Sequence, residues 1–263
     1  MIGQACFSLS DGVEQSLKCA YEKETVPASS FALKSLIDNA RIASEKHIPV
    51  CQDTGMAVIF ADIGIDVHFN GDFVAAVNEG VRQGYKENNC RNSVLDPITR
   101  INTSDNTPAI IHTTLCEGDK VTLKFLPKGF GSENMSKLYM LTPAAGIDGV
   151  LDKIVEAVKS AGSNPCPPII VGVGIGGTAD YVMTLAKKAL LRDMNTPSND
   201  KTVAEMEKTA LKRINELGIG VQGFGGGTTA LDVRIETYPT HIAALPVGVA
   251  IQCNAHRCAR RTI

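Results

Sequence analysis

The sequence has no marked excess of charge and no long apolar run. Its 263 residues include 26 Lys and Arg against 28 Asp and Glu, a formal net charge of -2 at pH 7. A nucleic-acid-binding surface is usually strongly basic, so we expect neither nucleic acid nor an anionic membrane surface as a partner. A membrane-spanning helix needs about 20 consecutive apolar residues, and no run of that length occurs.

An export signal is lacking as well. Residues 1–4 have neither the basic start nor the apolar stretch of a secretory signal, so we expect a cytoplasmic protein. Disulfides are disfavoured in a reducing cytosol, and the eight cysteines are therefore expected to remain thiols. Small, buried hydrophobic positions are expected for five of them: Cys6, Cys19, Cys90, Cys116 and Cys258.

Internal repeats, low-complexity segments and long Pro-rich or Gly/Ser-rich linkers are also absent. The length suits one large domain or two small ones. With 44% hydrophobic and 21% charged residues, the composition is that of an ordinary globular protein. We therefore interpret residues 1–263 as a single domain, with two lobes as the alternative.

Hydrophobic spacing and capping residues predict the α+β class, with N-terminal helices followed by small β-sheets and packed helices. Leu33, Leu36, Ile37 and Ala40, for example, recur at helical spacing after two serines that can cap a helix. The predicted helices span about 10–24, 29–46, 72–86, 150–161, 178–192 and 198–217. The predicted strands span 56–61, 109–114, 120–126, 168–173, 231–236 and 243–252. Early helices and clustered strands fit this class better than strict β–α alternation does.

A glycine pattern at residues 172–177 raises one alternative function. It satisfies G-x-G-x-x-G, follows a predicted strand and has Asp193 at a suitable distance, as in dinucleotide-binding proteins. A nucleotide-binding oxidoreductase is therefore a candidate. Residues 218–223 match the same pattern, however, and 24 glycines make chance matches easy. We favour a glycine-rich turn where the backbone approaches a neighbour closely.

Three cysteines stand in unusual local settings. Cys51 precedes Gln52, Asp53 and a Gly-ended turn, Cys166 lies between prolines, and Cys253 follows a predicted apolar strand. Their wide separation matches neither zinc-finger spacing nor the bunched cysteines of ferredoxins. They can be structural, or they can hold an iron–sulfur cluster that leaves one iron without a protein ligand. The residues alone leave both interpretations open.

Polar residues near these cysteines have two interpretations each. Asp53 suits a general acid or base, but it also suits an Asx turn. His241 can be catalytic, or buried and hydrogen-bonded. Arg91 can clamp a carboxylate through two hydrogen bonds, or lie on the surface. Lys128 and the backbone amides of residues 129–131 can cradle an anion.

Taken together, these segments resemble one known family, the class I fumarases and L-tartrate dehydratases, and in particular its α subunit. The matching segments are 51–55 (Cys-Gln-Asp-Thr-Gly), 128–134 (Lys-Gly-Phe-Gly-Ser-Glu-Asn), 166–168 (Cys-Pro-Pro), 223–228 (Gly-Phe-Gly-Gly-Gly-Thr), and His241 with Cys253 and Asn254. The resemblance covers nearly the whole chain in the same order, which makes it far more specific than any single motif.

The resemblance implies a [4Fe–4S] cluster held by Cys51, Cys166 and Cys253, with the fourth iron open to substrate. It also implies a set of residues that face the substrate: Gln52, Asp53, Arg91, Gly129, Gly131 and His241. Among them, Asp53 and His241 are expected to be catalytic. Phe130 is bulkier than the Gly or Ala expected in that loop, which narrows the pocket but leaves the backbone contacts possible.

The family's remaining substrate contacts lie in a β-type domain, which the chain up to Ile263 does not contain. The resemblance therefore implies a β subunit, an α2β2 heterotetramer and a C4 dicarboxylate substrate. Hydration of fumarate to malate is the favoured reaction, and dehydration of L-tartrate to oxaloacetate is the alternative. A subunit that only scaffolds its partner is a third interpretation, disfavoured because a scaffold needs neither Asp53 nor the three cysteines.

Overall fold

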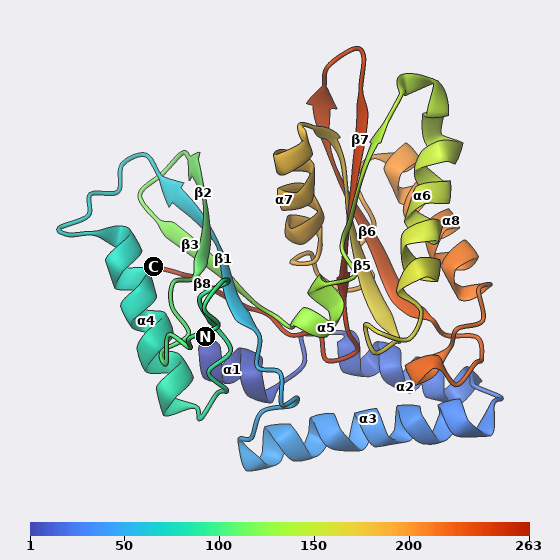
Figure 1. Ribbon diagram of the computed structural model, residues 1–263, viewed down its shortest axis with the longest axis horizontal. Coiled ribbons are helices and arrows are strands. Elements are labelled where there is room, and N and C mark those ends of the chain that lie inside the picture. The colour runs from blue at the N-terminus through green and yellow to red at the C-terminus, as the bar shows by residue number, and fades with distance from the viewer. The chain divides into compact units, whose positions relative to one another are not determined.

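The computed structural model describes residues 1–263, which divide into two compact units (Figure 1). Unit 1 comprises Met1–Ser10, Asn39–Phe130 and Arg257–Ile263, and unit 2 comprises Asp11–Asp38 and Gly131–His256. Each unit has a four-stranded sheet and its own apolar core. Helices and mixed sheets occur together, as the α+β prediction requires. No helix combines the length and apolar character needed to cross a membrane.

The sheet of unit 1 has the strand order β2-β1-β3-β8. Its central strand β1 (Met56–Gly64) pairs in parallel with β2 (Ile110–Cys116) and antiparallel with β3 (Val121–Lys128). β3 also pairs antiparallel with β8 (Ala259–Thr262). Five consecutive residues of β1 are buried, which explains why the strand reads as an apolar run rather than an alternation.

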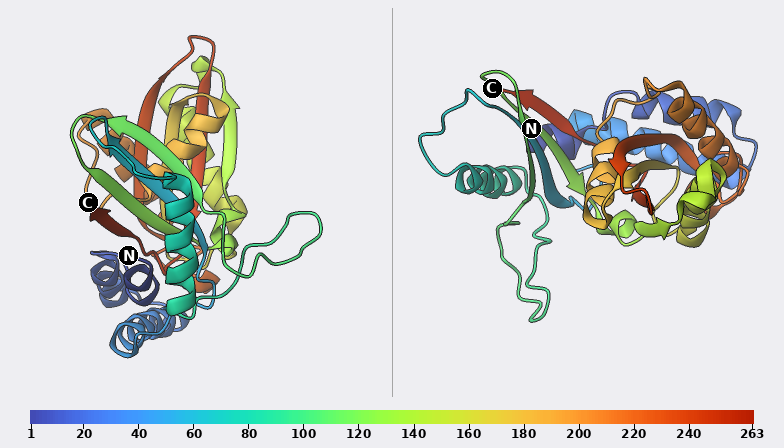
Figure 2. Two further views of the ribbon diagram at one scale, coloured as in Figure 1. Left: turned by 90° about the vertical axis from the view of Figure 1, so that its left-hand side faces the viewer. Right: turned by 90° about the horizontal axis from the view of Figure 1, so that it is seen from above.

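Two helices lie wholly within unit 1, α1 (Ile2–Phe7) and α4 (Phe73–Glu87). Asp72 caps α4, since its Oδ1 accepts a hydrogen bond from the amide of Ala75 at 3.0 Å. Gly84 lets α1 pack closely, because a Cβ there would lie 2.5 Å from Cδ1 of Ile2. Figure 2 shows the long connection between α4 and β2 extending away from the sheet.

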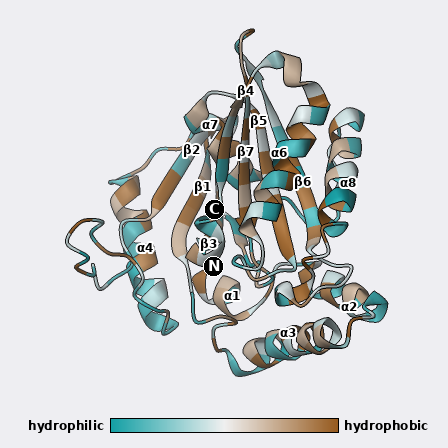
Figure 3. Ribbon diagram, turned by 45° about the vertical axis from the view of Figure 1, so that its right-hand side comes forward, coloured by the Kyte–Doolittle hydropathy of each residue, from teal (hydrophilic) through white to brown (hydrophobic).

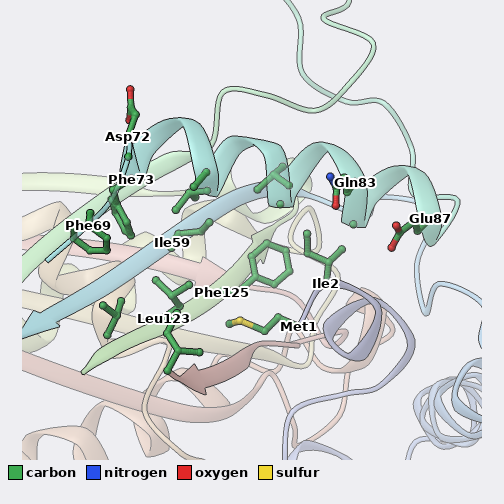
Figure 4. A pocket seen from close by; sticks show the side chains of 18 of the residues that line it. Met1, Ile2, Ile59, Phe69, Asp72, Phe73, Gln83, Glu87, Leu123 and Phe125 are labelled. Atoms are coloured by element: carbon green, nitrogen blue, oxygen red, sulfur yellow. The ribbon is translucent and has the colours of Figure 1, made fainter. Parts of the chain in front are cut away.

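A cavity of about 690 Å³ lies between α4, α1 and the sheet (Figure 4). Its lining is mostly apolar and includes Ile59, Phe73 and Phe125, while Asp72 and Glu87 also border it. None of the predicted substrate-binding residues or cysteine ligands lines it. The cavity is therefore separate from the candidate site described below.

The sheet of unit 2 has the order β4-β7-β5-β6. β5 (Ile169–Gly177) pairs in parallel with β6 (Ala230–Thr240) and antiparallel with β7 (Leu245–Gln252). β4 (Lys137–Leu141) pairs antiparallel with β7. Figure 3 shows that these strands are predominantly hydrophobic.

Helices cover both faces of this sheet (Figure 1). One face packs against α7 (Ala179–Ala189), and the other against α6 (Gly146–Ala161) and α8 (Lys201–Asn215). Val171 and Val173 point toward α6 and α8, where they join the core. The remaining helical elements are α2 (Val13–Lys23), α3 (Pro27–Lys46), α5 (Phe130–Glu133), η1 (Pro143–Ala145) and η2 (Val221–Gly223).

The glycine pattern at 172–177 lies within β5 rather than in a loop. A Cβ on Gly172 would lie 2.2 Å from the carbonyl oxygen of Ala186, and one on Gly174 would lie 2.2 Å from that of Val182. The glycines therefore let α7 pack directly on the sheet. The predicted close approach is confirmed, but it occurs in a strand. A dinucleotide fingerprint needs these glycines in the turn between strand and helix, so this alternative loses its structural basis.

Other differences from the sequence prediction are local. α3 begins at Pro27, a residue suited to the first helical position, and Ser29 does not act as its cap. Instead, Ser29 Oγ donates to the carbonyl of Gly225 at 2.6 Å. The segment 128–134, one of those that match the family, contains the short helix α5. The elements α1, β4 and β8 were not predicted, because each is too short to show a periodic pattern.

Candidate active site

Asp53 is the centre of the candidate residues in unit 1. One carboxylate oxygen, Oδ1, accepts a hydrogen bond from the amide of Gly55 at 3.0 Å, which is the expected Asx turn. The other, Oδ2, accepts one from the amide of Phe130 at 2.9 Å. Gly129 adjoins the carboxylate, because a Cβ built there would lie 3.1 Å from Oδ2. Backbone donors thus fix both oxygens of a partly exposed carboxylate.

Two buried side chains donate hydrogen bonds to backbone carbonyl oxygens of the Asp53 turn. Arg257, only 2% exposed, donates from Nη2 to the carbonyl oxygen of Asp53 at 2.5 Å. The hydroxyl of Tyr85 donates to the carbonyl oxygen of Gly55 at 3.0 Å. Burial raises the pKa of Tyr85, so this hydroxyl stays protonated and remains a donor. Neither residue was singled out from the sequence, because no local pattern marks a buried tyrosine or arginine as a support.

Arg91 and Gln52 complete the candidate set in unit 1. The amide of Arg91 donates to Oγ1 of the buried Thr54 at 3.0 Å, so the backbone of Arg91 is tied to the Asp53 turn. The side chains of Arg91 and Gln52 are exposed, and can reach a ligand. Unit 1 therefore gathers four of the six predicted substrate-facing residues: Gln52, Asp53, Arg91 and Gly129.

Unit 2 brings together two of the three predicted cluster ligands. Cys166 precedes β5 and Cys253 follows β7, and the antiparallel pairing of Ile170 with Gln252 puts both at the same end of the sheet. The carbonyl oxygen of Cys166 accepts hydrogen bonds from the amide and from Nδ2 of Asn254, at 3.2 and 2.7 Å. Cys166 also has φ of 54°, a backbone conformation uncommon outside glycine.

Gly131 lies near this end of unit 2, whereas His241 does not. A Cβ on Gly131 would lie 3.7 Å from the carbonyl oxygen of Asn164, in the turn that leads to Cys166. His241 is exposed in the connection before β7, where its Nδ1 accepts from the amide of Ala243 at 3.2 Å. Because β7 has eight residues, at about 3.4 Å each, His241 and Cys253 lie roughly 25 Å apart.

The predicted cluster ligands have the exposure expected of ligands. Cys51 and Cys253 are partly exposed and Cys166 is exposed, each at a turn or strand end. Cys51 belongs to unit 1 and the other two to unit 2. Within neither unit do three or more His, Cys, Asp or Glu side chains form a group that could hold a metal ion. The donor chemistry fits an iron–sulfur cluster, and the three-cysteine site stays a prediction.

The five cysteines expected in the core differ among themselves. Cys6 and Cys90 are buried, as predicted, while Cys19 and Cys258 are only partly buried. The prediction is wrong for Cys116, which is exposed. Cys116 ends β2, an edge strand most of whose residues are exposed. The sequence pattern of β2 does not distinguish this edge position from a covered one.

Comparison with known proteins identifies the class of enzyme as a hydro-lyase. The sequence model of the Fumerase family (fumarate hydratase) matches residues 1–262, and the chain belongs to this family. It is 43% identical over 267 residues to "Putative L(+)-tartrate dehydratase subunit alpha" of Methanocaldococcus jannaschii, covering 99% of this chain and 94% of that protein. It is 28% identical over 251 residues to L(+)-tartrate dehydratase subunit alpha of Escherichia coli K12, covering 94% and 83%.

Proposed function

We propose that the chain is the α subunit of an iron–sulfur hydro-lyase that dehydrates L-tartrate to oxaloacetate. Family membership supports the reaction type, and the names of the relatives support tartrate as the substrate. Hydration of fumarate to malate, the reaction favoured from the sequence alone, becomes the second candidate. Both reactions eliminate or add water across the same two carbons of a C4 dicarboxylate, so the same α-subunit residues can serve either.

The observation that carries the proposal is the fixed carboxylate of Asp53. A carboxylate oxygen has two lone-pair sites, and the amides of Gly55 and Phe130 occupy only one on each oxygen. The remaining sites can bind the hydroxyl group of a substrate. We assign the protonated form of Asp53 as the acid that gives a proton to the departing hydroxide, which then leaves as water. Asp53 afterwards takes up a proton from solvent, and the base releases to solvent the proton that it removed from carbon.

Arg91 and Gln52 are proposed to bind and orient the substrate. The exposed guanidinium of Arg91 can hold one carboxylate through two parallel hydrogen bonds. Gln52 and the amide of Gly131 can donate to the other polar oxygens. Holding the dicarboxylate in one orientation aligns its hydroxyl with Asp53 and lowers the entropic part of the barrier.

Cys51, Cys166 and Cys253 are proposed to hold the [4Fe–4S] cluster. When bound, the cluster supplies a Lewis-acidic iron that polarises the carbon–oxygen bond of the substrate hydroxyl. Three partly exposed or exposed thiols suit this role better than buried ones, because the ligand is the thiolate and burial in an apolar core disfavours it.

The elimination also requires a base that removes the proton from the neighbouring carbon. We assign it to a β subunit in an α2β2 assembly, in keeping with the word "subunit" in the names of both relatives. His241 is given no step, because β7 separates it from Cys253 within unit 2. The proton and the hydroxide that leave the substrate together make one water.

The experiment is an anaerobic assay of the chain co-purified with its β subunit, against L-tartrate, each other tartrate isomer and fumarate. We expect the highest kcat/KM with L-tartrate. A higher kcat/KM with fumarate would instead establish the second candidate. Absence of activity with every C4 dicarboxylate, in protein that shows the visible absorbance of an iron–sulfur cluster, would overturn the proposal.

A further inference from the structure

Two buried thiols lie in contact with each other in the core of unit 1. The Sγ atoms of Cys6 and Cys90 are 3.3 Å apart, although 84 positions separate them in the sequence. Both belong to the core of unit 1, with exposed fractions of 1% and 9%. Cys6 lies in α1, and Cys90 lies in the connection that follows α4.

Each thiol adjoins a segment of the candidate site. The carbonyl oxygen of Cys6 accepts a hydrogen bond of 2.9 Å from the amide of Val50, the residue before Cys51. Cys90 directly precedes Arg91, whose own amide is bound to Thr54. A change in the distance between the two sulfurs therefore reaches the backbone of both segments.

The two thiols are chemically unequal. Their mutual hydrogen bond lowers the pKa of Cys6, whereas the same bond, together with burial, raises the pKa of Cys90. Cys6 is thus the better source of a thiolate, the nucleophile in thiol oxidation, and Cys90 is the partner that resolves the product. A disulfide bond is about 2.05 Å long, so the sulfurs need to approach by about 1.2 Å.

The cavity of unit 1 lies close to this pair, although neither cysteine lines it. The cavity of unit 1 is lined by Met1, Ile2 and Gly3 and by Val81, which shares the core cluster of Cys6 and Cys90 (Figure 4). The helix α1 has only six residues and no side-chain cap hydrogen bond, and short elements of this kind open locally at low free-energy cost. Opening of α1 exposes Cys6 without unfolding the sheet.

We propose that Cys6 and Cys90 form a reversible oxidation site, at which a peroxide converts the two thiols to a disulfide that displaces Arg91. The existence of the disulfide is independent of the proposed function. Its effect on substrate binding rests on the role proposed for Arg91. A disulfide pulls Cys90 toward α1, and the guanidinium of Arg91 moves with its backbone away from the substrate carboxylate.

The oxidation is balanced with one hydrogen peroxide. The thiolate of Cys6 attacks one peroxide oxygen, the oxygen–oxygen bond breaks, and Cys6 becomes a sulfenic acid while hydroxide leaves and takes up a proton. The sulfur of Cys90 then attacks that of Cys6, and the second hydroxide leaves with the proton of Cys90. Two thiols and one peroxide give one disulfide and two waters, with two electrons passing to the peroxide.

The site is tested by peptide mapping of the full-length chain after treatment with hydrogen peroxide. Remaining thiols are alkylated, the protein is digested without reductant, and peptides are identified by mass spectrometry. We expect one linked pair, the Cys6 and Cys90 peptides, separated by dithiothreitol. The variant Cys6→Ser should lack this pair, and Cys116→Ser, which removes an exposed thiol, should keep it. Oxidation of Cys116 without a Cys6–Cys90 link would overturn the proposal.

The effect on Arg91 is tested by kinetics of the cluster-loaded enzyme, reconstituted without thiol reductant. In the oxidised wild type we expect KM to rise about tenfold, the scale of losing a charged hydrogen bond, and to recover with dithiothreitol. Oxidised Cys6→Ser should keep its KM. Cluster damage would instead lower kcat in both proteins. A linked pair with unchanged KM would refute the displacement of Arg91, and the linkage itself is measurable even if L-tartrate is not the substrate.

Discussion

The substitution Asp53→Asn tests the candidate site most directly, and its effect follows from the two hydrogen bonds of this carboxylate. Both oxygens accept from backbone amides. The asparagine side chain has one oxygen acceptor and one NH2 donor, so its NH2 group must face the amide of either Gly55 or Phe130. One hydrogen bond is lost and two donors oppose each other.

The expected cost in stability is about 1–3 kcal/mol, the range for an unsatisfied polar group, and we expect the lower end because Phe130 is 47% exposed. For a chain of this size, about 1 kcal/mol corresponds to a fall in Tm of about 2–4 °C. Loss of the proton donor should also lower kcat by about 10²–10⁴-fold. KM should change little, because Arg91 remains.

The assay compares kcat, KM and Tm of the wild type, Asp53→Asn and a control, Asp119→Asn. Asp119 is an exposed aspartate of the same unit, in the turn between β2 and β3. Visible absorbance is measured alongside, so that loss of the cluster is distinguished from loss of the acid. Wild-type kcat in Asp53→Asn would refute the acid role, and an unchanged Tm would refute the argument about opposed donors.

Three further predictions concern the fold and its pH dependence. Gly174→Ala should lower the free energy of unfolding by about 1–3 kcal/mol in chemical denaturation, because its Cβ would meet a backbone oxygen of α7 at 2.2 Å; Gly71→Ala, with open space around it, should be nearly neutral. Tyr85→Phe should lower Tm and kcat together, because the carbonyl of Gly55 loses its buried donor; wild-type values of both would contradict the supporting role. Hydrogen bonds from Thr107 and Arg82 lower the pKa of Asp105 to about 2. The stability that Asp105 contributes is therefore complete above its unfolded pKa near 3.8 and is lost as pH falls toward 2, which an NMR titration of Asp105 and hydrogen exchange of its loop can check.

The sequence predicts those elements whose own residues carry the signal. The helix α4 is predictable because Asp72 caps it and buried Val81 and Tyr85 are spaced four residues apart. The strand β8 is not, because four residues show no period and its pairing with β3 joins Thr262 to Thr122, 140 residues away. Strand pairing at such a distance depends on the fold as a whole.

The same distinction applies to the candidate site. Cys51, Asp53 and Gly129 are assigned to the site through a resemblance that spans the chain, since their spacing alone left several interpretations open, and this assignment stays a prediction. The contact of Arg257 with Asp53, over 204 residues, is visible only in the structure. The position of His241 at the opposite end of β7 from Cys253 is likewise a result of strand geometry, which a list of motifs does not contain.

The division of the chain has a consequence for its synthesis. Unit 1 is made of three separate segments of the chain. Residues 131–256, which belong to unit 2, are translated before residues 257–263, the last segment of unit 1. Residues 257–263 contain both Arg257, which donates a hydrogen bond to the carbonyl oxygen of Asp53, and the edge strand β8. During translation, the four-stranded sheet of unit 1 therefore cannot be completed until residues 257–263 have been made. Most of unit 2 has left the ribosome by then. A nascent chain that stalls before Arg257 lacks the hydrogen bond from Arg257 to the carbonyl oxygen of Asp53.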